Sequence, residues 1–250
     1  MIFNLLYSDL PMNITIGLMI LQLFCVVLAL TVHEYAHGYA ASKLGDPTAG
    51  LQGRLTLNPL AHIDPVGFLM MLLVGFGWAK PVPVNIRLMK NPKKGLAITS
   101  LAGPGINLCV ALVCGIAVGA LDQFGYNPFQ LFLEMGFSDS VSPMAVLSYT
   151  LYMMVLLNVG LALFNLIPIP PLDGSNVLVS FLPNTVAAKY LQIRYYTRYI
   201  FGGIMLISVL ADRIALFYYL DQIIWFPFEW LRETLSSAFI NLGELIFSFI

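Results

Sequence analysis

The segment His33-Glu34-Tyr35-Ala36-His37 carries side chains whose types and spacing suit metal chemistry. Two histidines four residues apart on a helix project from the same face, so both imidazoles can bind one metal ion. Glu34 directly follows His33 and can reach a water molecule on that ion. The pattern therefore predicts a zinc site with an activated water.

The motif lies at the end of a long apolar run, which argues against a chance match. Residues 14–32 contain no charged side chain, and the run continues through the motif to Lys43, ahead of Gly45 and Asp46-Pro47. Such a run is long enough to enter a bilayer as a helix. Because ionisable groups inside a membrane helix are costly, their presence there indicates a function.

A catalytic zinc site needs a third protein ligand and one position left open for water. The best candidate is Asp173, which lies between a proline-rich stretch and Gly174. The prolines prevent a helix from continuing, and the glycine permits a tight turn. Asp before Gly is more commonly a plain turn residue. Asp173 is expected on the same side of the membrane as His33, which favours the ligand interpretation.

The composition predicts an all-α membrane protein, a polytopic helical bundle. The chain is 59% hydrophobic and only 10% charged, whereas a soluble domain of this size has about 25% charged residues. Its length suits one integral membrane domain over residues 1–250. The catalytic core is expected at about 14–180, and a C-terminal span with an amphipathic tail at 199–250. The net charge of −1 gives no sign of a nucleic-acid partner.

Four long apolar runs predict about four transmembrane helices. They cover residues 14–43, 96–121, 144–167 and 199–220, and the last is weaker because Asp212-Arg213 interrupts it. Residues 66–79 form a shorter apolar stretch, which we expect to dip into the membrane or to lie on its surface. Residues after Pro227 alternate apolar and polar positions at helical spacing, which predicts an amphipathic helix in the interface or docked on the bundle.

The distribution of basic residues predicts the orientation. Seven Lys or Arg lie between residues 43 and 94, and three more between 168 and 198, whereas the loop 122–143 has acidic residues but no basic one. By the positive-inside rule the metal-bearing ends face the cytoplasm. We therefore expect a multi-pass protein of the cell inner or plasma membrane with a cytoplasmic active site. The segments 53–57 and 81–85 pair as short strands in one interpretation and form an ordinary linker in the other.

The chain resembles the site-2 protease family of intramembrane zinc metalloproteases, in its compact branch without an inserted PDZ domain. The resemblance covers roughly residues 14–180, and the ordered combination of motifs is more specific than any one of them. The motifs are His33-Glu34-x-x-His37, Leu172-Asp173-Gly174, Asn165 eight residues before that aspartate, NPLAHIDP at 58–65 and AGPGIN at 102–107.

The resemblance implies one Zn²⁺ per chain, held by His33, His37 and Asp173, with Glu34 as general base. It also implies hydrolysis of peptide bonds within or next to transmembrane segments. The expected partners are then transmembrane proteins or membrane peptides as substrates, together with the lipid bilayer.

Three further residues are candidates beside the metal. Asn165 is the first candidate to stabilise the oxyanion of a tetrahedral intermediate, although a buried membrane asparagine also suits an interhelical hydrogen bond. Asn107 follows a Gly-Pro-Gly stretch, which lets helices approach closely and so favours a packing role over a catalytic one. His62 is expected near the site as a positioning or substrate-binding residue and not as a ligand.

Two other classes of function remain open from the sequence. A membrane metal carrier or sensor needs ligands spread along a path, but only one cluster is visible. A non-catalytic membrane adaptor needs no general base, yet every expected catalytic residue is present. Both alternatives are less favoured than an intramembrane zinc metalloendopeptidase.

Overall fold

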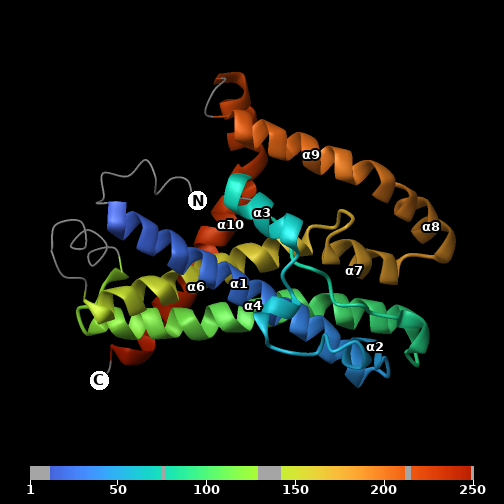
Figure 1. Ribbon diagram of the computed structural model, residues 1–250, viewed down its shortest axis with the longest axis horizontal. Helices are drawn as coiled ribbons and strands as arrows, with labels where there is room; N and C mark the ends of the chain where they lie inside the picture. Colours follow the sequence, from blue (N-terminus) through green and yellow to red (C-terminus); the bar gives the residue numbers. More distant parts are fainter. Residues whose placement is uncertain (1–11, 75–76, 129–141, 212–214, 249–250) are drawn as a thin grey trace.

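The computed structural model describes residues 12–74, 77–128, 142–211 and 215–248, which form helices joined by loops (Figure 1). No extended strand occurs in these ranges, and the expected all-α architecture is confirmed. The long helices are α1 (Met12–Lys43), α4 (Pro92–Gln123), α6 (Pro143–Leu166), α9 (Arg194–Leu210) and α10 (Ala215–Phe247). The short elements are α2 (Thr48–Leu51), α3 (Pro65–Val74), α7 (Asp173–Phe181), α8 (Asn184–Gln192) and the 3-10 turns η2 (Pro59–Ala61) and η3 (Ile86–Leu88).

Three of the expected spans appear as helices long and apolar enough to cross a membrane, namely α1, α4 and the Val146–Leu166 part of α6. Their outer faces remain apolar. On α1, for example, Ile16, Ile20 and Phe24 are 49%, 63% and 55% exposed and follow one another at four-residue spacing. Large apolar side chains exposed along a whole helix face suit contact with lipid tails.

The fourth expected span, 199–220, is not one continuous helix. α9 ends at Leu210 after 17 residues, and α10 begins at Ala215. The interrupting pair Asp212-Arg213 falls outside the described residues. The C-terminal helix also begins earlier than expected, since α10 runs through Pro227. A proline inside a helix costs one backbone hydrogen bond, which packing against neighbouring helices can offset.

α4 is the central helix, because α1, α6, α7 and α10 all pack against it. Its start is well defined: the Asn91 side chain accepts a hydrogen bond from the Lys94 amide, and Pro92 occupies the first turn. These are the standard features of a helix N-terminus. Because it packs against both α1 and α7, α4 contacts the two helices that carry the candidate ligands.

The C-terminal helix is docked on the bundle, the second of the two expected alternatives. Gly115 and Gly119 of α4 face Phe239 and Ile240 of α10, and Gly243 of α10 faces Ile116. A side chain at any of these three glycines would collide with backbone atoms of the other helix. Small residues four apart allow two membrane helices to approach at backbone distance.

The short apolar segment forms α3, which at ten residues is about 15 Å long and too short to cross a bilayer. The chain just before α3 pairs with the chain after it: Ile63 and Ala79 form an isolated antiparallel bridge, and the Lys80 amide donates to the His62 carbonyl. The strand pair considered for 53–57 and 81–85 is absent, since no residue of these two segments belongs to a strand.

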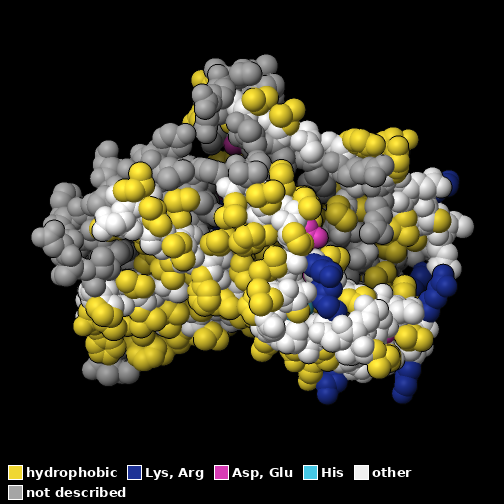
Figure 2. Space-filling view, viewed as in Figure 1, with side chains coloured by type: hydrophobic (Ala, Val, Ile, Leu, Met, Phe, Trp, Pro, Cys, Tyr) yellow, Lys and Arg dark blue, Asp and Glu magenta, His cyan; other side chains and the backbone are white. Residues whose placement is uncertain are grey.

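The surface separates into an apolar body and a basic end (Figure 2). On the face in view, hydrophobic side chains predominate in the centre and at the lower left, whereas Lys and Arg side chains gather near α2 and the start of α4. This is the arrangement expected of a bundle surrounded by lipid with one end in an aqueous compartment.

The glycine contacts between α4 and α10 lead to a prediction. Gly119→Leu should lower the free energy of unfolding by about 1–3 kcal/mol, because the new side chain overpacks the crossing. Gly17→Leu in α1 is the control, since no atom lies within 4 Å of a Cβ there. The check is thermal unfolding in detergent, and equal midpoints for the two variants would contradict the prediction.

Candidate metal centre

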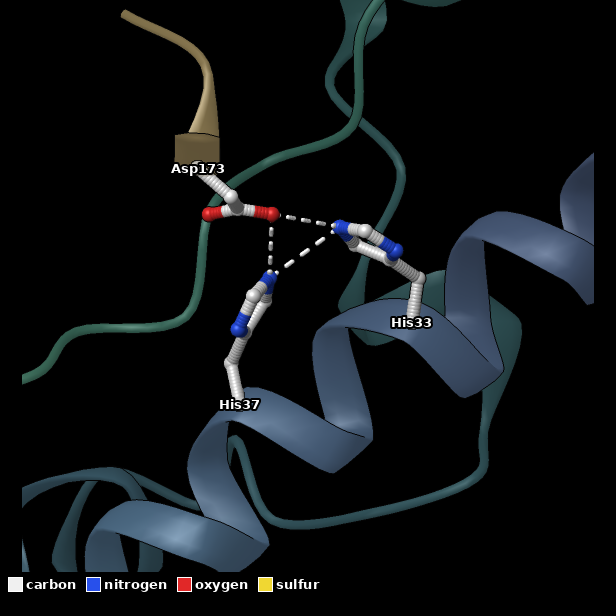
Figure 3. Close-up of side chains that lie close together, drawn as sticks. All are labelled: His33, His37 and Asp173. Carbon is white, nitrogen blue, oxygen red and sulfur yellow. Dashed lines mark hydrogen bonds and ion pairs between the residues drawn. The ribbon is translucent and has the colours of Figure 1, made fainter. Parts of the chain in front are cut away.

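The side chains of His33, His37 and Asp173 point toward one common location (Figure 3). The two Nε2 atoms lie 3.0 Å apart. Asp173 Oδ2 lies 3.2 Å from His33 Nε2 and 3.1 Å from His37 Nε2. Among the described residues, no other group of three His, Cys, Asp or Glu side chains is close enough to hold a metal ion. The site thus joins α1 to the first residue of α7.

Local backbone structure brings these three residues together. One helical turn separates His33 from His37 on α1. α6 ends at Leu166, and the prolines that follow delay the next helix until Asp173. Gly174 then lies against the Leu166 carbonyl, where any side chain would collide with the backbone. This turn directs Asp173 back toward α1.

The hydrogen bonds of the other ring nitrogens define the tautomers. His37 Nδ1 lies 2.7 Å from the Thr99 carbonyl, and a carbonyl can only accept, so this nitrogen carries the proton. His33 Nδ1 lies 2.6 Å from Asn107 Oδ1. Both Nε2 atoms are therefore left with lone pairs facing the shared location, the form in which neutral imidazole binds a metal.

A chain of buried amides supports the assignment at His33. Asn158 Nδ2 donates to the Met154 carbonyl, and Asn107 Nδ2 donates to Asn158 Oδ1 at 2.6 Å. Asn107 Oδ1 is then the atom that faces His33, and it must accept from Nδ1–H. This series of hydrogen bonds ends on a backbone carbonyl, which can only accept. The donor and acceptor of each bond are therefore determined, and so is the ring orientation of His33.

The donor set fits a zinc ion. Two imidazole lone pairs and a carboxylate oxygen within 3.2 Å of one another repel unless a cation lies between them. Asp173 Oδ2 is buried and receives no hydrogen bond from the described residues. Tetrahedral zinc with N and O ligands at about 2.0–2.1 Å places ligand atoms about 3.3 Å apart and, with three protein ligands, leaves one position open.

Gly103 of α4 lies against both imidazoles. A Cβ at this position would be 2.5 Å from His37 Nε2 and 2.7 Å from His33 Cε1. Thr99, Gly103 and Asn107 follow one another at four-residue spacing and so share one face of α4. On that face, the Thr99 carbonyl accepts from His37 and Asn107 Oδ1 accepts from His33. Gly103, between them, leaves room for the two imidazole rings.

Glu34 contacts the loop between α3 and α4. Its Oε2 accepts a hydrogen bond from the Val82 amide at 2.8 Å. The loop is anchored in turn by Asp46, which is fully buried and accepts from the amides of Asn85 and Thr48. Burial raises the pKa of Asp46, but the hydrogen bonds from Thr48 and Asn85 lower it by more, so it stays ionised at neutral pH.

The remaining sequence candidates occupy different places. Asn107 contacts His33 directly, so it has a positioning contact beyond helix packing. Asn165 Nδ2 donates to the Leu161 carbonyl of its own helix at 3.0 Å. His62 Nε2 lies 2.8 Å from the Thr56 carbonyl, and His62 is not part of the ligand group.

Sequence reasoning missed Thr99, Gly103, Asn158 and the Val82 amide. Asn158 carried a usable signal, because it is a second amide side chain in the apolar run 144–167. Gly103 was noted only as part of a packing stretch. Thr99 and Val82 act through backbone atoms, which every residue type possesses, so no sequence signal pointed to them.

Comparisons with known proteins agree with this chemistry. The profile described as "Peptidase family M50" matches residues 21–210. The Bacillus subtilis protein named "Putative zinc metalloprotease YwhC" is 38% identical over 184 residues, covering 72% of this chain and 78% of that protein. "Putative zinc metalloprotease Rip2" of Mycolicibacterium smegmatis is 27% identical over 235 residues, 91% of this chain and 80% of the relative. No solved structure gives a significant match.

The contact of Gly103 with both rings predicts a specific loss of metal. Gly103→Ala should weaken zinc binding about 10–100-fold, the range found when groups supporting a ligand are disturbed. Gly105→Ala in the same helix is the matched control, because nothing lies within 4 Å of its Cβ. Chelator competition on the purified proteins measures both affinities. Similar values for the two variants would show that Gly103 does not seat the ligand pair.

Proposed function

Since this chain belongs to peptidase family M50, the site-2 protease family of intramembrane zinc metalloproteases, we propose that His33, His37 and Asp173 hold its zinc ion and that Glu34 is the general base. The observation that carries the proposal is the meeting of three acceptor atoms whose lone pairs face one location. When bound, zinc lowers the pKa of its water toward about 7 and polarises the scissile carbonyl.

Glu34 takes the proton from the attacking water and returns it to the leaving amine. The Val82 amide engages Oε2 at 2.8 Å, which holds the carboxylate in one orientation and leaves Oε1 for the water. A general base needs this kind of positioning, because proton transfer requires hydrogen-bond distance.

Asn165 is the proposed donor to the oxyanion. Its Nδ2 already donates one hydrogen to the Leu161 carbonyl. An amide nitrogen has two N–H groups, so a second hydrogen remains for a developing negative charge. Asn165 lies in the last turn of α6, from which the chain leads to Asp173.

The proposed location of the site is the cytoplasmic side of the cell membrane. His33 and His37 lie in the last part of α1, near Lys43, and Asp173 follows the end of α6. The basic residues gather at this end of the bundle (Figure 2), which the positive-inside rule assigns to the cytoplasm. We take residues 1–250 as one catalytic domain.

The substrates are membrane-embedded, as for the family. We propose transmembrane segments of membrane proteins or membrane peptides, cut within or next to the span. Membership of a peptidase family favours hydrolysis over the metal-carrier and adaptor alternatives. A carrier also needs a second ligand cluster, and the described residues contain one cluster only.

The general-base role gives a direct test. Glu34→Gln should keep the zinc content of the wild type, because Glu34 is not among the three ligand residues. Its rate of peptide cleavage should fall by about 10²–10⁴-fold through loss of the proton acceptor. The comparison is made on purified protein with zinc analysis and a membrane-peptide assay. Asp173→Ala should lose both zinc and activity. Wild-type cleavage by Glu34→Gln would refute the assignment.

The orientation is tested by labelling single cysteines from each side of the membrane. In a variant lacking Cys25, Cys109 and Cys114, a cysteine replacing Lys189 should react only from the cytoplasm. A cysteine replacing Asp139 should react only from outside. Labelling of both from the same side would show that the proposed topology is wrong.

A further inference from the structure

A small cavity lies between α1, η2 and α3. Its walls include Val27 and Leu30 of α1, Met71 of α3, His62 and Ala79. The cavity measures about 20 Å³, whereas a single water needs about 10–15 Å³ by the same measure. It therefore has room for one methyl-sized group, and its lining is mostly apolar.

The cavity lies beside the general base. Val27, Leu30 and Glu34 are spaced by three and four residues, so they share one face of α1. Leu30 precedes Glu34 by four residues, a rise of about 6 Å along the helix. On the opposite wall, Ala79 comes three residues before Val82, whose amide binds Glu34. A peptide held for attack near Glu34 would pass this cavity.

His62 lines the cavity and carries a buried acceptor that has no partner among the described residues. The side chain is only 2% exposed. Its Nε2 lies 2.8 Å from the Thr56 carbonyl, so Nε2 carries the proton and Nδ1 has the lone pair. Nδ1 is buried and has no hydrogen-bond partner among the described residues. A buried polar atom left without a partner costs about 1–3 kcal/mol, which calls for a ligand that donates a hydrogen bond.

Such a donor arises when a membrane helix is prepared for cleavage. Helical hydrogen bonds must open before the scissile carbonyl is accessible, and each opened bond leaves a peptide N–H without an acceptor. In an environment without water such a group is costly. A buried acceptor next to the general base would offset that cost at the position where it arises.

We propose that this cavity is a substrate subsite, in which His62 Nδ1 accepts a backbone N–H of the unwound substrate. A small side chain next to that N–H occupies the apolar cavity. The inference rests on the proposed function, because it assumes a peptide substrate at Glu34. It makes His62 a binding residue and makes the cavity size a determinant of specificity.

The hydrogen bond is tested by changing the donor and the acceptor together. The probe is a synthetic apolar peptide of about 25 residues, long enough to span the bilayer, with central Gly and Ala residues and terminal lysines. In a set of analogues, one backbone amide at a time near the cleavage site is replaced by an ester, which removes its N–H. Cleavage of each analogue is measured with wild type and with His62→Phe.

At one position, the ester should lower kcat/KM about tenfold for the wild type, the size expected for one buried hydrogen bond. The same ester should have little further effect on His62→Phe. Arg54→Met is the control for loosening of the loop, because Arg54 Nη2 donates to the Lys80 carbonyl but Arg54 does not line the cavity. This control should keep the wild-type ester effect. Equal ester effects in wild type and His62→Phe at every position would overturn the proposal.

The size of the cavity is tested separately, in a variant that leaves His62 in place. Met71 is buried and lines the cavity, whereas Leu69 of the same helix is 53% exposed and does not. Met71→Ala should shift the preference at one residue next to the cleaved bond from Gly or Ala toward Leu, and Leu69→Ala should not. An unchanged preference in Met71→Ala would overturn the subsite.

Failure of the proposed function would look different from failure of the subsite. Cleavage that persists in Glu34→Gln would contradict the zinc-protease assignment of the residues. Cleavage that depends on Glu34, but shows neither the ester effect nor the change in preference, would contradict the subsite alone.

Discussion

Two imidazole nitrogens and a carboxylate oxygen meet within 3.2 Å inside an apolar bundle. Three acceptors at this distance are mutually repulsive in a medium of low dielectric, so the arrangement is stable only with a shared cation. A further contact positions each of the three ligand residues. Asn107 holds His33, the Thr99 carbonyl holds His37, and the turn at Gly174 holds Asp173. Much of the bundle can be understood as the support for this one contact.

α4 provides most of that support without supplying a ligand. Thr99, Gly103 and Asn107 lie on the face of α4 next to the histidines, and further along the helix its packing with α10 uses Gly115 and Gly119. Polar groups are costly in a bilayer unless each one has a partner. The buried Asn107 Nδ2 donates to Asn158 Oδ1, and Asn158 Nδ2 donates to the Met154 carbonyl. These hydrogen bonds hold His33 in position, and they also satisfy polar groups that would otherwise destabilise a membrane helix.

On α1, the metal ligands and the proposed general base lie on two different faces. His33 and His37 face α4 and α7, where the metal ligands meet. Glu34, one residue from His33, faces the loop that runs from α3 to α4 and accepts the Val82 amide. Successive residues on a helix project about 100° apart, so adjacent positions can serve a metal and a base without competing. The loop is anchored at Asp46 and at the bridge between Ile63 and Ala79. It therefore links the base to the cavity at α3.

The sequence alone determined the features that depend on local spacing and on the bilayer. The pairing of His33 with His37 follows from the helical repeat, and three spans follow from the length of their apolar runs. Asp173 could be placed near the histidines because prolines end the preceding helix at the same end of the bundle.

Tertiary structure decided what depends on backbone atoms and on packing partners. The Thr99 carbonyl and the Val82 amide exist in any residue, so their roles follow only from where the chain passes. The charged pair Asp212-Arg213 already marked 199–220 as the weakest of the four expected spans, but only the structure gives the end of α9 at Leu210. The pairing of 53–57 with 81–85 was uncertain for a similar reason. Which backbone segments pair depends on the path of the chain after α3, and here that path pairs Ile63 with Ala79.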